Sequence, residues 1–167
     1  MISATSHLTT NRPLILTSRV IETFFSRVLK EYRPISTLTI VSPWISIWEV
    51  GKVGLLGLRE MIDHRKIRTL ILTRPPEHDW HTNALNILNS SSFVSIFLLE
   101  QLHAKIFVCE AIPVGFGLIG SANLTAQSLH NLEVAILFEG RGILSPLIKE
   151  LKILIWQDLR SLSKKKY

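Results

Sequence analysis

A histidine and a lysine two positions apart are the residues of this chain that point most directly to chemistry. They lie in the run Leu102-His103-Ala104-Lys105-Ile106, which is apolar at every other position and predicts a strand whose successive side chains face opposite ways. His103 and Lys105 then share one face, and the apolar residues point into the core. An imidazole beside an ammonium on a buried strand is costly unless it serves a function. The pair suits a phosphate, which the ring can attack or protonate while the cation balances charge.

Two later segments add hydrogen-bonding groups that belong with this pair. Gly120-Ser121-Ala122-Asn123, if extended, places the Ser121 hydroxyl and the Asn123 amide on one face. With Lys105, these groups would donate hydrogen bonds to the oxygens of a tetrahedral anion. Glu133, on a third extended run, would hold the far nitrogen of the imidazole and fix its tautomer. The set predicts a site that attacks a phosphodiester.

This pattern resembles the phospholipase D superfamily, whose signature is H-x-K, four residues, D, six residues and G-S-x-N. The chain has H-x-K at His103 and G-S-x-N at Gly120. Glu110 stands where the family has Asp, and nine residues rather than six separate it from Gly120. In the family that acidic residue supports the structure, so we expect glutamate to be tolerated. The longer gap fits a hairpin built from Pro113 and Gly115.

Asn131 with Glu133, and the upstream segments 41–44 and 73–76, also look like the family, so the resemblance extends over about residues 14–160. It implies a phospholipase D-like domain that needs neither metal nor cofactor. It also implies a catalytic set and a supporting set of residues. The catalytic set is His103, Lys105, Ser121, Asn123 and Glu133, and the supporting set is Glu110, Gly120 and Asn131.

The family's reaction uses two such motifs, because one histidine forms a phosphohistidine while the other protonates the leaving oxygen. This chain has one motif, since His64-Arg65-Lys66 spells H-x-K with no G-S-x-N after it and reads as a charged turn. We therefore expect a homodimer in which two copies of His103 face each other at a shared site. The apolar flank of the last helix, with Ile153 and Trp156, either packs across the sheet or forms part of that interface.

Three functions stay open. The first is a metal-independent nuclease acting on DNA or RNA, alone or as the cutting subunit of a larger assembly, which agrees with the net charge of +6. The second is a phospholipid phosphodiesterase at a membrane surface, for which Trp44, Ile45, Ile47 and Trp48 would form an apolar rim. The third is a non-catalytic module that binds nucleic acid or a partner, and the intact His103 motif argues against it.

Two further patterns predict no site. Residues 115–120 match G-x-G-x-x-G, but they lead into an apolar strand rather than a helix, so we expect no dinucleotide there. His78, Asp79 and His81 offer too few metal ligands and fit a loop or a helix cap after Pro75-Pro76.

The remaining sequence predicts the elements that position the site. Helical spacing of apolar residues is expected over residues 18–32, 55–64, 82–90 and 144–162. Strands are expected over residues 14–16, 38–42, 67–73, 93–99, 102–108, 117–120 and 132–138. This alternation predicts an α/β fold with a mixed sheet flanked by helices on both faces.

Composition sets the outer bounds. With 167 residues, 47% of them hydrophobic, we expect one domain over 1–167, and disordered ends over 1–12 and 162–167 are compatible with the sequence. The single cysteine, Cys109, excludes a disulfide framework and fits a reducing compartment, so a cytoplasmic location is expected. No uncharged apolar run reaches the roughly 18 residues of a membrane span, so no transmembrane segment is expected.

Overall fold

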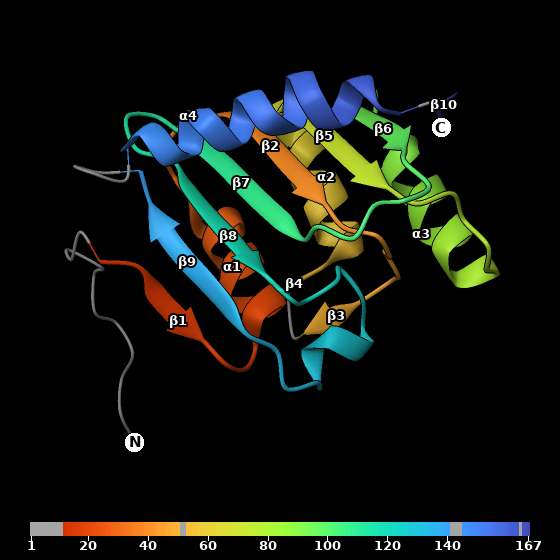
Figure 1. The fold of residues 1–167 in the computed structure, drawn as a ribbon, viewed down its shortest axis with the longest axis horizontal. Helices are drawn as coiled ribbons and strands as arrows, with labels where there is room; N and C mark the ends of the chain where they lie inside the picture. The colour runs from red at the N-terminus through yellow and green to blue at the C-terminus, as the bar shows by residue number, and fades with distance from the viewer. Residues whose placement is uncertain (1–11, 51–52, 141–144, 164) are drawn as a thin grey trace.

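The computed structural model describes residues 12–50, 53–140, 145–163 and 165–167. Within them, an eight-stranded sheet forms the centre of the molecule (Figure 1). Its strands in chain order are β1 (Leu14–Leu16), β2 (Ile35–Val41), β5 (Arg68–Thr73), β6 (Val94–Leu98), β7 (Ile106–Ala111), β8 (Phe116–Gly120), β9 (Ala135–Glu139) and β10 (Lys165–Lys166). Their order in space is β1-β9-β8-β7-β2-β5-β6-β10. A small separate ribbon pairs β3 (Glu49–Val50) with β4 (Val53–Gly54).

Strands β2, β5 and β6 run parallel to one another, and every other neighbouring pair is antiparallel. The parallel strands are connected through helices, as parallel pairing requires. Strands β7 and β8 are joined by the short hairpin that the sequence predicts around Pro113 and Gly115. The sheet is therefore mixed, as expected.

Helices cover both faces of this sheet. On one face lie α1 (Val20–Lys30), α2 (Leu55–Arg65) and α3 (Asp79–Asn89), which share one hydrophobic core with the strands. On the other, α4 (Ser145–Ile153) and its π-helical continuation η3 (Leu154–Leu159) cross the sheet (Figure 1). The predicted fold class is confirmed.

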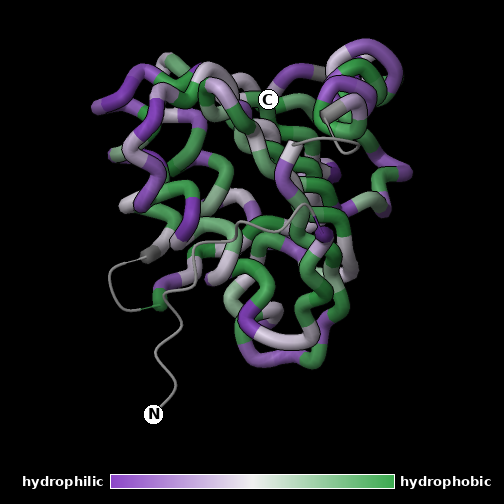
Figure 2. The backbone as a smooth tube through the Cα atoms, turned by 90° about the vertical axis from the view of Figure 1, so that its left-hand side faces the viewer, coloured by the Kyte–Doolittle hydropathy of each residue, from purple (hydrophilic) through white to green (hydrophobic). Residues whose placement is uncertain are grey.

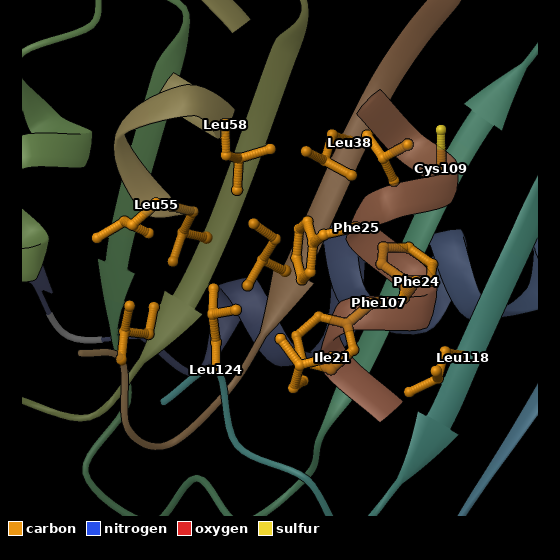
Figure 3. Packing of buried hydrophobic residues seen from close by; sticks show 14 of the residues in the cluster. Ile21, Phe24, Phe25, Leu38, Leu55, Leu58, Phe107, Cys109, Leu118 and Leu124 are labelled. Atoms are coloured by element: carbon orange, nitrogen blue, oxygen red, sulfur yellow. The ribbon is translucent and has the colours of Figure 1, made fainter. Parts of the chain in front are cut away.

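Aromatic rings hold α1 against the sheet. The Phe24 ring centroid lies 5.1 Å from that of Phe25, 5.6 Å from Phe107 and 5.4 Å from Phe116, and all four residues are fully buried. Figure 3 shows Phe24, Phe25 and Phe107 among the buried side chains of this core. Burying each ring contributes about 2–3 kcal/mol before entropy is counted. Figure 2 shows the backbone coloured by hydropathy, with hydrophobic residues concentrated towards the centre and hydrophilic and hydrophobic residues alternating along the outer turns.

Strand β7 is buried on both faces. Phe107 and Cys109 belong to the core on the α1 side, and Ile106 and Val108 belong to the core under α4. Burial raises the pKa of the Cys109 thiol to about 12, so the thiol stays protonated as part of the core. A strand packed from both sides has little freedom to move, so β7 is a rigid support for the residues that precede it.

Several element boundaries differ from the sequence-based prediction. Strand β7 begins at Ile106 rather than Leu102, so His103 and Lys105 lie before the strand and not within it. Strand β9 begins at Ala135 rather than Leu132. Helix α3 begins at Asp79 rather than Thr82, and His78 is its N-cap without a side-chain capping bond. The predicted helix cap is therefore correct for His78, whereas Asp79 and His81 lie in the first helical turn. An acidic residue in that turn is favoured by the positive end of the helix dipole. Among the described residues, no three His, Cys, Asp or Glu side chains gather as a metal site.

At the other end, the structure places a strand where the sequence is compatible with disorder over 162–167. Lys165–Lys166 form β10 against β6, and the Tyr167 N–H donates to the Ile96 carbonyl at 3.0 Å. The exposed edge of β6 supplies the unpaired groups that this segment satisfies. The expected disordered end over 1–12 lies outside the described residues apart from Arg12. No helix in the described part of the chain is long and apolar enough to cross a membrane.

Candidate active site

The predicted catalytic residues lie at one edge of the sheet. Val41, at the end of β2, pairs with Ile106 at the start of β7. Gly120, at the end of β8, pairs with Ala135 at the start of β9. We call this edge the site edge. The parallel strands β2 and β5 also end there, and ligands of α/β sheets commonly bind beyond the carboxyl ends of such strands.

His103 and Lys105 lie in the extended segment just before β7. Leu102 and Ala104 pack into the core under α4, as the predicted alternation requires, and His103 is exposed. Lys105 is only 9% exposed. Its Nζ donates to the His103 main-chain carbonyl at 2.7 Å and lies 3.5 Å from Nδ1 of the ring. The second distance is at the limit of a hydrogen bond, so this contact does not fix the tautomer of His103.

The Lys105 ammonium is in surroundings that suit an anion. Burial lowers the pKa of Lys105 below its ordinary value, the Arg74 cation lowers it further, and the Glu133 carboxylate raises it. The two cations therefore affect each other at the site edge. A bound phosphate would relieve this repulsion through charge-assisted hydrogen bonds.

One hydrogen bond joins the two sequence motifs. The Gly120 N–H donates to the Lys105 carbonyl at 3.2 Å, so the segment that carries Lys105 lies beside the start of G-S-x-N. A Cβ at position 120 would lie 2.5 Å from both the Val134 carbonyl oxygen and the Ala135 Cβ. Only glycine allows β8 and β9 to approach this closely. Gly120 therefore allows the close packing of the two strand ends at the site edge.

Ser121 is fixed between β8 and the segment before β9. Its N–H donates to the Val134 carbonyl at 2.9 Å, and the Val134 N–H donates to Ser121 Oγ at 3.1 Å. The Ser121 hydroxyl donates to the Glu133 carboxylate. The Glu133 carboxylate therefore accepts its hydrogen bond from Ser121 and not, as the sequence predicts, from the His103 ring. The pairing of Gly120 with Ala135 explains this, because it brings the residues just beyond these two strand ends together.

Asn123, in the loop after β8, is half-buried. Its Oδ1 is buried and has no hydrogen-bond partner in the described part of the chain. Leaving such a group unpaired costs about 1–3 kcal/mol, so a ligand that satisfies the amide would be favoured. A half-turn of the amide exchanges its oxygen and nitrogen and presents the donor to an anion. The loop itself is held by Ser42, whose Oγ accepts the Leu124 N–H at 2.9 Å.

Two predicted supporting residues lie elsewhere. Glu110 is near the far end of β7 from His103, where its carboxylate accepts hydrogen bonds from Thr37 Oγ1 and, at 3.0 Å, from Lys152 Nζ. It therefore ties β7 to β2 and α4, which is a structural role. Asn131 is exposed after the 3₁₀ turn η1 (Gln127–Leu129), and its main-chain N–H donates to the Gln127 carbonyl at 3.2 Å.

Comparison by sequence finds no matching family model and no matching curated protein. Comparison by structure finds Nuc from Salmonella typhimurium, described as a phospholipase D family member. It superposes with a TM-score of 0.68 at 14% identity, over 93% of this chain and 99% of Nuc. The chain has the phospholipase D fold. The resemblance drawn from the motifs is thereby confirmed for the fold.

Two further solved structures share the phospholipase D fold with this chain. NucT from Helicobacter pylori has a TM-score of 0.61 at 12% identity, over 89% of this chain and 96% of NucT. Polyphosphate kinase from Porphyromonas gingivalis also has a TM-score of 0.61, at 10% identity. The match covers 87% of this chain and 26% of the kinase.

Within this phospholipase D fold, Arg74 is a site residue that the sequence analysis missed. Its Nε donates to the Leu102 carbonyl at 2.7 Å, one residue before His103. Its main-chain N–H donates to the Pro43 carbonyl at 3.3 Å, which joins the loops after β5 and β2. The signal that could have found it is its place directly after a parallel strand.

His81 was also missed, as a buried neutral histidine beneath the site edge. Its Nε2 lies 3.1 Å from Thr73 Oγ1, and the Thr73 hydroxyl donates to the Pro43 carbonyl at 3.1 Å. The Thr73 hydroxyl proton is donated to Pro43, so the hydrogen bond between His81 and Thr73 must be donated by the Nε2–H of His81 and accepted by Thr73 Oγ1. Burial, helped by the nearby His78, lowers the pKa of His81 to about 4, so the ring is neutral near pH 7.

Proposed function

We propose that this chain is a phosphodiesterase that cleaves nucleic acid, with His103 as the nucleophile. The observation that supports this most is the hydrogen bond from Gly120 to Lys105, because it brings H-x-K beside G-S-x-N at the site edge. The phospholipase D fold of Nuc and NucT is consistent with this chemistry. The same fold in a polyphosphate kinase is consistent with a site that handles phosphate.

In the proposed reaction, a ring nitrogen of His103 attacks phosphorus while the bond to the leaving oxygen breaks. That oxygen takes a proton from a second histidine, which leaves a phosphohistidine. Water then attacks phosphorus, the P–N bond breaks with its electron pair returning to His103, and the second histidine takes the water proton. One phosphodiester and one water thus give one phosphomonoester and one alcohol. Lys105 and the Asn123 amide stabilise the charge that develops on the phosphate oxygens.

The second histidine must come from elsewhere, because one ring cannot attack and protonate at the same time. The sequence contains a single H-x-K followed by G-S-x-N. We propose that the partner's His103 supplies the proton in a two-fold dimer whose two copies share one site.

An exposed apolar surface beside the site supports this arrangement. Ile136 of β9 pairs with Ile15 of β1 on one side and with Ile119 of β8 on the other, and all three side chains are exposed. Val134 and Leu132, just before β9 in the chain, are exposed as well, and Leu132 is 87% exposed. We call these five residues the isoleucine patch. Apolar surface of this kind marks interaction sites in folded proteins.

The isoleucine patch continues directly into the site, because Val134 exchanges two hydrogen bonds with Ser121. A second copy seated on it would bring its own site edge close to the first. The flank of the last helix is less suitable. Trp156 is partly buried there, and its Nε1 donates to Thr39 Oγ1 at 3.3 Å, so it is used within the chain.

Nucleic acid is favoured over phospholipid as the substrate. Of the four residues expected to form an apolar rim, Ile45 and Trp48 are buried in the core. The phospholipid candidate therefore loses half of the surface on which it depends. The net charge of +6, with Lys105 and Arg74 at the site edge, favours a polyanion.

The test is a substrate panel of DNA, RNA and phospholipid vesicles in excess chelator. Cleavage of nucleic acid is expected, and His103→Ala should abolish it. His64→Ala is the matched control, because His64 is exposed and also begins an H-x-K triplet. Turnover that survives His103→Ala would show that the nucleophile is another residue. Turnover that requires added metal would contradict the mechanism, and binding without any cleavage would favour a non-catalytic module.

A further inference from the structure

A group of aromatic side chains lies beside the site and has no part in the reaction proposed above. The ring centroids of His78 and Trp80 are 5.4 Å apart with planes inclined by 21°, so these rings are stacked. Trp44, from the loop after β2, lies 6.0 Å from Trp80 and 6.3 Å from His78. We call these three residues the aromatic platform.

The aromatic platform is open to solvent at His78 and Trp80, whereas Trp44 is half-buried. Trp80 is 42% exposed and His78 is exposed, whereas the side chains that fix α3 to the sheet, Leu85 and Leu88, are fully buried. Helix α3 therefore does not depend on Trp80 for its packing. The Trp80 ring contacts three neighbouring rings, because the His81 ring also lies 5.6 Å from it with planes inclined by 21°. These contacts hold the exposed part of the indole in place, where it can meet a ligand.

Arg74 connects the platform to the phosphate-binding residues. Its guanidinium carbon lies 5.5 Å from the Trp44 ring centroid. Its Nε donates to the carbonyl of Leu102, the residue before His103, at 2.7 Å. A ligand that spans platform and site would thus meet aromatic faces at one end and cations at the other.

We propose that the aromatic platform stacks an unpaired nucleobase of the substrate while Arg74 and Lys105 bind its backbone phosphate. This inference rests on the proposed function and specifies the substrate as single-stranded. A base in a duplex is already stacked on both sides, so only an unpaired base is free to lie on a protein ring. A quaternary ammonium headgroup also fits aromatic rings, but the Arg74 guanidinium over Trp44 would repel it.

The experiment measures binding by the His103→Ala chain, which leaves the strand uncut. The probes are a short oligothymidylate and an abasic strand of the same length, at one salt concentration. The oligothymidylate should bind roughly five- to a hundredfold more tightly, the range expected for one stacked base. Trp80→Ala should remove this difference without weakening the abasic strand, and Trp80→Phe should keep most of it. Tyr32→Ala, which removes an exposed ring outside the platform, is the matched control and should change neither affinity.

Equal affinity for the two strands, or equal weakening of both by Trp80→Ala, would overturn the inference. Binding of phosphocholine vesicles that is lost in Trp80→Ala would overturn it in favour of a lipid headgroup. Cleavage by the chain with His103 intact is measured in parallel. Cleavage without a preference for bases contradicts the platform alone, whereas failure to cleave any nucleic acid contradicts the proposed function itself.

Discussion

Gly120 and Ala135 lie so close across β8 and β9 that a Cβ at position 120 would come within 2.5 Å of the Ala135 Cβ. The contact allows Ser121 to bond to Val134 and Glu133. Gly120→Ala should force the strands apart, lower the free energy of unfolding by about 1–3 kcal/mol and reduce turnover. Chemical denaturation measures the free energy of unfolding, and a cleavage assay measures turnover. Gly57→Ala, in helix α2, is the control and should not lower stability, because alanine favours a helix by about 1 kcal/mol. An unchanged Gly120→Ala protein would contradict the close-packed site.

Lys105→Met should separate activity from stability. The ammonium is buried and its pKa is lowered chiefly by that burial, so the charge does not stabilise the fold. Methionine fills a similar volume without charge. We expect turnover to fall about a hundredfold or more, as when an oxyanion-stabilising group is removed, with no loss in the free energy of unfolding. Steady-state kinetics beside denaturant unfolding checks this, and a large loss of stability would assign Lys105 a structural role.

Ile136→Glu should dissociate the proposed dimer. If a second copy covers the isoleucine patch, the new carboxylate is buried in the interface and weakens association. If the patch faces water, the substitution has little effect on the free energy of the protein. We expect sedimentation to show the mass of one chain, with cleavage at least tenfold lower at the same protein concentration. Ile153→Glu is the matched control, since Ile136 is 46% exposed and Ile153 is 42% exposed. A dimer lost only in Ile153→Glu would move the interface to α4.

Stability should depend on pH through His81. Its pKa is about 4 in the folded chain and 6.5 ordinarily, so between these values the unfolded chain binds more protons. The free energy of unfolding should therefore fall as the pH decreases from about 6.5 to about 4, by at most about 3 kcal/mol. Urea unfolding across this range measures the slope. His81→Gln should flatten it, and His64→Ala, at an exposed position, should not. An unchanged slope in His81→Gln would refute this assignment.

Glu110→Gln should affect stability and spare catalysis. Glu110 ties β7 to Thr37 and Lys152, well away from His103. Because the Lys152 side chain is partly exposed, the loss should be about 1 kcal/mol in the free energy of unfolding. The rate constant for cleavage should stay within about twofold of the unsubstituted chain. A large fall in that rate constant would place Glu110 in the catalytic machinery.

Sequence periodicity predicted most of the fold because the strands here are dominated by burial. The alternation around Lys105 agrees with the packing of Leu102 and Ala104 under α4, although the strand predicted there begins only at Ile106. The α3 start was missed because its first turn contains Trp80 and His81, which follow two prolines and lack a side-chain cap. The local signals for a helix start there were weak: only Asp79 in the first turn and a possible cap at His78 pointed to it.

The hydrogen-bond partners of the site residues were harder to predict, because these contacts depend on which strand ends lie next to each other in the sheet. Spacing indicated that Ser121 and Glu133 belong to one site, but it could not show that they bind each other. Arg74 reaches Leu102 across two loops that are far apart in sequence. The isoleucine patch could not be predicted either, because Ile119 and Ile136 are of a residue type that is usually buried, yet both are exposed.

Strand β10 has a consequence for how the protein behaves at high concentration. Its pairing with Phe97 and Leu98, continued by Tyr167, covers the outer rim of β6. An exposed edge strand offers unpaired N–H and C=O groups with which strands of other chains can pair, and many aggregates and fibrils begin in this way. Trimming residues 165–167, or fusing a bulky tag next to them, would uncover that template and favour precipitation during purification.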